Sequence, residues 1–225
     1  MRYDIFNIIH KGLRASLYHT AIQLQQTDFT STVESEDAMN RIKEIVMLFD
    51  GHAHKEDQFI LPAIAAYEPS VVVTFEDEHA EDLRLGQELN NCIEALENSQ
   101  SLLEKIIAGK ELTKAFVGFM VYNLEHMAKE EDILNKLLWR YYSDDEIKLI
   151  GSNISKSIEP WIQDFYATWI LRGLNQNEAI SWIKAIKKGL PAIVYQTLLQ
   201  KAEKELTPQR FRILSFQLRK ELQVA

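Results

Sequence analysis

Apolar residues recur every three or four positions along most of the first 140 residues, and this spacing places them on one face of an α-helix. The first such stripe consists of Phe6, Ile9, Leu13 and Leu17. Together the stripes predict four long helices, over residues 3–26, 35–67, 70–107 and 111–141. The best β-like run, residues 71–74, leads directly into the third stripe. We therefore expect an all-α protein built on an up-down four-helix bundle.

Proline and glycine suggest where these helices bend or end. Pro62 lies inside the second predicted helix, and it should kink or shorten that helix because proline lacks a backbone donor. Gly109 is a plausible end of the third helix, with the fourth starting near Thr113. Only 8 glycines and 5 prolines in 225 residues are consistent with a helical chain that has short connections.

The last 80 residues continue the helical pattern in shorter segments. Their predicted boundaries are Ser143-Asp144-Asp145, Pro160, Gly173, Asn175 with Glu178 as a capping box, Gly189 before Pro191, and Thr207-Pro208. This part contains three tryptophans and no histidine. Because no flexible linker precedes it, we expect residues 1–142 to form the bundle and residues 143–225 to form a helical extension packed on it. A homodimer contact through these C-terminal helices is the alternative.

Four histidines fall one apiece on the four predicted long helices, and two of them are followed four residues later by a glutamate. Residues four apart lie on the same face of a helix and can grip one cation together. The set is His10, His52 with Glu56, His79, and His126 with Glu130. Two such pairs alone are only mildly unusual in a glutamate-rich chain.

The apolar surroundings of these six residues sharpen the prediction of a metal site. His79, for example, interrupts the stripe Val72, Phe75, Leu83, Gly86, Ile93 and Leu96. A carboxylate in an apolar stripe needs a compensating charge, and the stripes offer no lysine or arginine to Glu56 or Glu130; Arg14, near His10, is the exception. A single histidine there is usually a hydrogen-bonded core residue, but four with two glutamates favour two metal ions. His19 and His54 should face away from the site.

These residues, in the order His10, His52-Ala53-His54-Lys55-Glu56, Glu78-His79 and His126-Met127-Ala128-Lys129-Glu130-Glu131, resemble the hemerythrin-like (HHE) cation-binding domain over about residues 1–142. The resemblance implies a four-helix bundle with a non-haem di-iron centre. Each iron would be bound by one pair of histidines, and both glutamates would bridge the two irons.

Two differences separate this chain from the oxygen-carrying hemerythrins. Those proteins have a second histidine one turn from the third-helix ligand, where this chain has Phe75 and Leu83 around His79. They also use an aspartate five residues after the last histidine, whereas here Glu130 stands at the fourth position and Glu131 at the fifth. The set is most similar to the di-iron domain of the proteins for repair of iron centres, which act in nitric-oxide and oxidative stress, and is similar to an iron-sensing domain of a eukaryotic F-box protein. Because His10 begins the bundle almost at once and Cys92 is the single cysteine of this sequence, we expect no cysteine-bearing N-terminal domain like that of the bacterial repair proteins.

The donor set itself suggests the chemistry. Imidazole and carboxylate suit iron, manganese or zinc. Two Fe(II) with two glutamates keep a net positive charge that favours a bridging oxo or hydroxo group and leaves a vacant position for a small molecule. We expect binding, sensing or modest redox chemistry with O2, peroxide or NO. Tyr122, one turn before His126, is either a donor near the site or a tyrosine that caps the core.

Composition excludes several partners. A net charge of −8 and a pI near 5.3 argue against nucleic acid. Residues 184–188 hold only a short cluster of lysines. No secretory leader or membrane-spanning stretch follows Met1, and the single Cys92 fits a reducing compartment, so we expect a cytoplasmic protein. The sequence contains no nicotinamide- or flavin-binding fingerprint. Two alternatives to a di-iron binding protein stay open: a metal-dependent oxidoreductase, and a helical interaction protein with structural or no metal.

Overall fold

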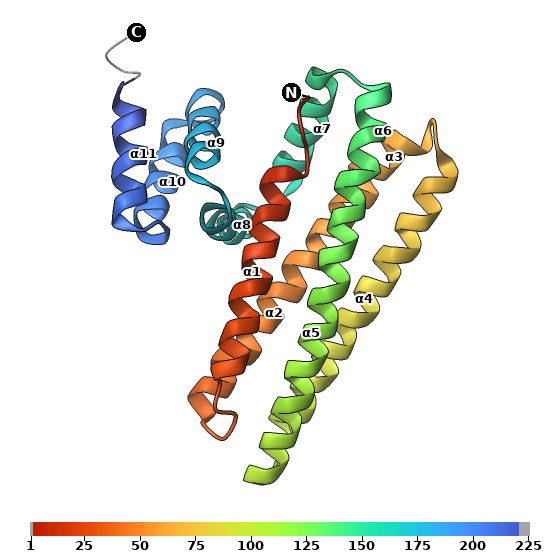
Figure 1. The fold of residues 1–225 in the computed structure, drawn as a ribbon, viewed down its shortest axis with the longest axis vertical. Coiled ribbons are helices and arrows are strands. Elements are labelled where there is room, and N and C mark those ends of the chain that lie inside the picture. The colour runs from red at the N-terminus through yellow and green to blue at the C-terminus, as the bar shows by residue number, and fades with distance from the viewer. Residues whose placement is uncertain (1, 221–225) are drawn as a thin grey trace. The chain divides into compact units, whose positions relative to one another are not determined.

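The computed structural model in Figure 1 describes residues 2–220 and is helical throughout, with no strand among those residues. The all-α prediction is therefore confirmed. The elements in chain order are α1 (Asn7–Gln26), α2 (Thr32–Lys55), the π-helical turn η1 (Glu56–Ile60), α3 (Leu61–Ala65), α4 (Pro69–Glu97), α5 (Leu102–Asp132), α6 (Leu134–Tyr141), α7 (Asp144–Ser157), α8 (Pro160–Gly173), α9 (Gln176–Gly189), α10 (Ala192–Glu205) and α11 (Pro208–Lys220).

The helices form two compact units. The first unit contains residues 2–7 and 16–158, and the second contains residues 8–15 and the described residues from 159 onward. Within the first unit, α2 packs on α4 and α4 packs on α5, and Figure 1 shows these as long helices joined by short connections. This is the helical bundle that the hydrophobic pattern predicts.

The boundary between α4 and α5 differs from the prediction. Helix α4 ends at Glu97, and α5 starts with a reciprocal capping box in which Ser101 accepts from the Glu104 amide while Glu104 accepts from the Ser101 amide. The predicted end at Gly109 and start near Thr113 are therefore wrong. Gly109 lies inside α5, where a Cβ atom would come within 2.2 Å of the Phe29 ring. Gly109 therefore allows the Phe29 ring to pack closely against α5 and does not end a helix.

The second predicted helix is interrupted where Pro62 lies, as expected. Regular α-helix ends at Lys55, and in η1 the Leu61 amide donates to the Glu56 carbonyl, five residues back. Pro62 has no amide hydrogen and its ring crowds the preceding turn, so a wide turn before it relieves both problems. Helix α3 then continues toward the end of the bundle.

A cluster of apolar side chains closes the bundle beyond η1. It joins η1, α3, α4, α6 and α7 through residues that are each at most 8% exposed: Phe6, Ile60, Leu61, Ile64, Val72, Phe75, Leu134, Leu137, Leu138 and Ile147. Helix α7 buries Ile147 here and belongs to the first unit, which extends to Ile158. The capping box that starts α7, Ser143 with Glu146, follows the predicted Ser143 break.

The second unit has an apolar core of its own. Helices α8 to α11 share the buried residues Leu171, Ile180, Ile183, Leu198, Ala202, Leu206, Leu214 and Leu218. The predicted capping box of Asn175 and Glu178 starts α9. Gly12 and Gly173 allow the first turns of α1 to approach α8 closely, since a Cβ on Gly173 would meet the Lys11 carbonyl oxygen at 2.2 Å. The packing of residues 143–225 on the bundle stays a prediction.

Candidate metal centre

Two histidines and two glutamates from three helical segments meet inside the first unit. Their ligand atoms all lie within 4.8 Å of one another, and the four residues are Glu56, His79, His126 and Glu130. His126 Nε2 is 3.1 Å from Glu130 Oε1, and His79 Nε2 is 3.4 Å from Glu56 Oε2 and 3.7 Å from Glu130 Oε1. None of the four is more than 7% exposed. Four of the six predicted ligands are therefore neighbours in a buried cluster.

The remaining two predicted ligands form a second candidate group with the same glutamates. Ligand atoms of His10, His52, Glu56 and Glu130 also lie within 4.8 Å of one another. His10 is fully buried on α1, and His52 Nε2 is 3.3 Å from Glu56 Oε1. Each glutamate thus belongs to both groups, as a residue bridging two cations would.

The positions that the sequence excluded behave as expected. His19 and His54 are both exposed and belong to neither group. At the end of α5 the buried carboxylate is Glu130, fully enclosed, while Glu131 is only half-buried. Of the two glutamates, Glu130, four residues after His126, is therefore the one that belongs to the candidate ligand groups.

Burial and carboxylates oppose each other at the two central histidines. Burial alone would lower the pKa of His79, but the neighbouring carboxylates of Glu130, Glu56 and Asp57 outweigh burial and raise the pKa to about 11. Burial likewise disfavours the charged His126, yet Glu130 and Glu78 raise its pKa to about 9. In the metal-free chain, protons on the imidazoles supply the positive charge that the buried carboxylates require.

Two further carboxylates hold the outer nitrogens of these histidines, and sequence analysis missed both. His79 Nδ1 is 2.6 Å from Asp57 Oδ1, and His126 Nδ1 is 2.7 Å from Glu78 Oε2. Lys129 Nζ donates to the other oxygen of Glu78 at 2.8 Å. Glu78 stood beside His79 in the sequence motif, but its partner is on another helix, and sequence spacing carried no sign of that pairing.

Tyr122 is half-buried and lies beside His126, one turn earlier on α5. Its hydroxyl donates to the Glu78 carbonyl at 2.8 Å, and its ring stacks on His126 with centroids 6.2 Å apart. Burial and the charge of Glu78 raise the pKa of Tyr122 to about 12. The tyrosine is therefore a neutral donor that supports α4 against α5 beside the candidate metal centre.

A polar layer lies one turn from the histidines. Asp82 is 3% exposed and accepts a hydrogen bond of 2.6 Å from Asn123 Nδ2. Burial and the charge of Asp82 raise the pKa of Asp50 on α2 to about 6. The prediction that Leu83 faces the core is wrong: Leu83 is 61% exposed, and its neighbour Asp82 points inward.

The donor atoms fit a metal ion. Atoms bound to one cation at about 2.0–2.2 Å lie about 3 Å from their neighbours in the coordination shell. The imidazole-to-carboxylate distances of 3.1 to 3.7 Å are close to that spacing. His79 Nε2 is buried and makes no hydrogen bond, so its lone pair or proton is aimed at the glutamates alone. Nitrogen and oxygen donors without sulfur suit iron, manganese or zinc.

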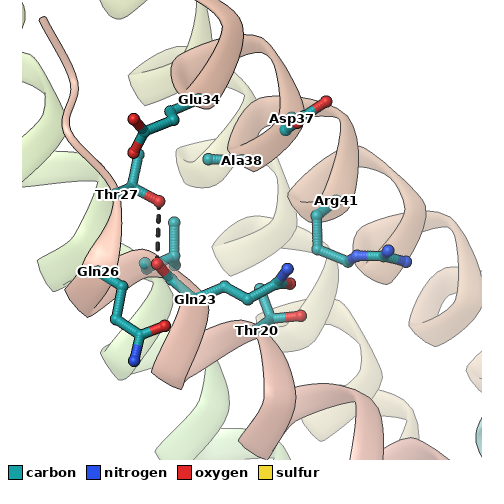
Figure 2. Close-up of a pocket in the computed structure, with 9 residues that line it drawn as sticks. Thr20, Gln23, Gln26, Thr27, Glu34, Asp37, Ala38 and Arg41 are labelled. Carbon is teal, nitrogen blue, oxygen red and sulfur yellow. Dashed lines mark hydrogen bonds between the residues drawn. The ribbon is translucent and has the colours of Figure 1, made fainter. Parts of the chain in front are cut away.

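A separate pocket of about 200 Å3 lies between the last turns of α1 and the first turns of α2. Figure 2 shows Thr20, Gln23 and Gln26 on one side of it and Glu34, Asp37 and Arg41 on the other. None of these residues belongs to either candidate metal group. The pocket therefore adds nothing to the metal centre.

Comparison with known proteins agrees with this geometry. A family model described as the hemerythrin HHE cation binding domain matches residues 2–138. The chain matches no curated protein and no solved structure. Among the described residues, no helix is both long and apolar enough to cross a membrane.

Proposed function

Because this chain belongs to the hemerythrin HHE cation-binding family, we propose that it is a non-haem di-iron protein whose six ligands are His10, His52, Glu56, His79, His126 and Glu130. One ion would be held by the pair His79 and His126, and the other by His10 and His52. Both glutamates would bridge. Manganese or zinc in place of iron is compatible with the same donors.

The observation that carries this proposal is the burial of Glu56 and Glu130 between histidines. Their exposures are 2% and 0%, and burying a carboxylate without compensating charge costs several kcal/mol or forces protonation. Both residues belong to both candidate ligand groups. Two bound cations would compensate both carboxylates at once.

The residues of the chain would bind and orient the ions. When bound, iron supplies a Lewis-acidic, redox-active centre that can accept a small ligand. Asp57 and Glu78 orient His79 and His126, and the closed apolar cluster around Phe75 and Leu134 limits water at one side of the centre. Such an enclosed site suits O2, peroxide or NO better than an extended organic substrate.

We further infer a role in sensing or processing these small molecules, or in handling iron, during oxidative or nitrosative stress in the cytoplasm. The support is the donor set: four neutral imidazoles and two carboxylates stabilise Fe(III) less strongly than carboxylate-rich sites do, which favours reversible binding or modest redox chemistry. Catalytic turnover would make the protein an oxidoreductase instead.

Metal analysis of the purified protein with an optical spectrum tests the proposal. About two irons per chain, with charge-transfer absorption that changes on exposure to O2, peroxide or NO, is the expected result. A colourless, metal-free protein that keeps its full thermal stability after treatment with a chelator would contradict it and would favour a helical interaction protein. Assays for consumption of peroxide or NO then separate binding from turnover.

A further inference from the structure

His79 and His126 are each held from two sides. On the inner side, their Nε2 atoms face Glu56 and Glu130 at 3.1 to 3.7 Å. On the outer side, their Nδ1 atoms lie 2.6 and 2.7 Å from Asp57 and Glu78. A carboxylate at Nδ1 requires a proton there, and this leaves Nε2 as the atom that donates to a metal.

The two outer carboxylates differ in their own surroundings. Glu78 is shared between His126 and Lys129, whose Nζ donates to it at 2.8 Å, so its negative charge is compensated. Burial raises the pKa of Glu78, but Lys129 and His126 outweigh burial and hold the pKa below its ordinary value. Asp57 is paired with His79, and no lysine or arginine within residues 2–220 pairs with it.

The backbone around each outer carboxylate is also held differently. Asp57 lies on the π-helical turn η1, one residue after the inner ligand Glu56. Glu78 lies on regular α4, where its carbonyl accepts the Tyr122 hydroxyl at 2.8 Å and the Tyr122 ring stacks on His126. On its outer side His126 is thus held by Glu78 and by the Tyr122 ring, whereas the outer nitrogen of His79 is held by Asp57.

Resting on the proposed metal function, we propose that Asp57 and Glu78 are positioning residues that fix His79 and His126 as Nε2 donors, and that the uncompensated Asp57 makes His79 the stronger donor. An anionic acceptor at Nδ1 withdraws the proton partially and increases electron density on Nε2. Lys129 reduces this effect at His126. The two histidines of one metal group are therefore unequal ligands.

The test uses the full chain loaded with Zn(II), whose diamagnetism permits proton–nitrogen NMR of the histidine rings. Wild type should carry ring protons on Nδ1 of both histidines, with the His79 proton at lower field. Asp57→Ala should remove that low-field signal and weaken zinc affinity about 10- to 100-fold. Asp57→Asn, which keeps an acceptor but not the charge, should give intermediate values.

A second variant tests the inequality directly. Lys129→Met removes the compensating charge and should move the His126 ring proton toward the position of the His79 proton. Asp77→Asn, an exposed carboxylate beside Glu78, is the matched control and should change neither the spectrum nor the affinity. Unfolding of the metal-free variants, followed by circular dichroism, separates loss of fold from loss of ring orientation.

The outcomes distinguish this inference from the proposed function. If wild type binds zinc and iron while Asp57→Ala matches Asp77→Asn in ring-proton position and affinity, the positioning role is overturned and the metal function survives. If Lys129→Met leaves the two ring protons as different as before, the inequality is overturned. Failure of wild type to bind any metal would remove the proposed function and this inference together.

Discussion

The rings of His79 and His126 lie with their centroids 5.0 Å apart at 76° to each other, and both Nε2 atoms face the same Glu130 oxygen. The two residues come from different helices, α4 and α5. An edge-to-face arrangement of two imidazoles around one carboxylate places three donor atoms at adjacent positions of one coordination shell. Two protonated rings this close would repel each other, and the nearby carboxylates offset that repulsion.

Removing a bridging glutamate should release metal. We expect Glu56→Ala to lose at least one iron per chain, because Glu56 belongs to both candidate groups. His54→Ala, two residues earlier and exposed, is the control and should retain full metal content. Metal analysis of both purified proteins checks this. Equal iron content in the two variants would show that the ligands have been chosen wrongly.

Metal affinity should rise with pH up to about pH 9 because metal and protons compete for His126. Burial opposes charge on His126, but Glu130 and Glu78 raise its pKa to about 9 in the metal-free chain. Binding should therefore release protons at neutral pH. Calorimetric titrations in buffers of different ionisation enthalpy measure this release, and a heat that is the same in every buffer would contradict it.

The same shift predicts how stability of the metal-free protein depends on pH. A histidine whose folded pKa is raised stabilises the fold below its ordinary value of 6.5, and this contribution is lost as pH rises through the folded value of about 9. The melting temperature of chelated protein should fall over that range. His54→Ala should show the same decline, whereas His126→Gln should reduce it and leave the part due to His79, whose pKa, which burial alone would lower, is raised to about 11 by Glu130, Glu56 and Asp57.

Two glycines on one helix should respond to alanine in opposite directions. Gly109→Ala places a methyl group against the Phe29 ring, and we expect it to destabilise the protein by about 1–3 kcal/mol. At Gly118 no atom lies within 4 Å of the added carbon, so Gly118→Ala should stabilise α5 by about 0.5–1 kcal/mol. Denaturant unfolding compares the two. Stabilisation by both would mean that Phe29 moves aside at little cost.

Helix α7 should contribute to the stability of the first unit. Ile147 is fully buried in the cluster with Phe6 and Leu134, and Ile147→Ala should cost about 2–5 kcal/mol. Leu149 on the same helix is 59% exposed, and Leu149→Ala should change stability by less than about 0.5 kcal/mol. Thermal unfolding of both variants measures this difference, and a similar small effect from each would place α7 outside the core.

Hydrophobic periodicity was sufficient to predict the helices and the inward direction of the candidate ligands. His10, Glu56 and Glu130 interrupt apolar stripes in the sequence, and all three are buried. The position of a residue on its own helix depends on local spacing, which the sequence contains. The same reasoning correctly placed His54 at the surface.

Features that depend on contacts between helices were not predictable. Gly109 suggested a helix end, because only the packed Phe29 ring reveals that the glycine provides space. Asp57 and Glu78 looked like ordinary surface carboxylates, since the histidines they hold lie 22 and 48 residues further along the chain. The Ser101 and Glu104 capping box was present in the sequence and would have given the correct start of α5.

The five-residue turn η1 lets the two ends of one long helix face different directions. Before η1, His52 faces the candidate metal ligands. After η1, Leu61 and Ile64 face the apolar cluster. If residues 56–60 took up regular α-helix at their present length, Leu61 and Ile64 would rotate by about 100° relative to His52, because the wide turn accommodates about one extra residue. Ligand geometry and end-of-bundle packing would then become mutually exclusive, so the conformation of this short segment is constrained more tightly than its exposed side chains suggest.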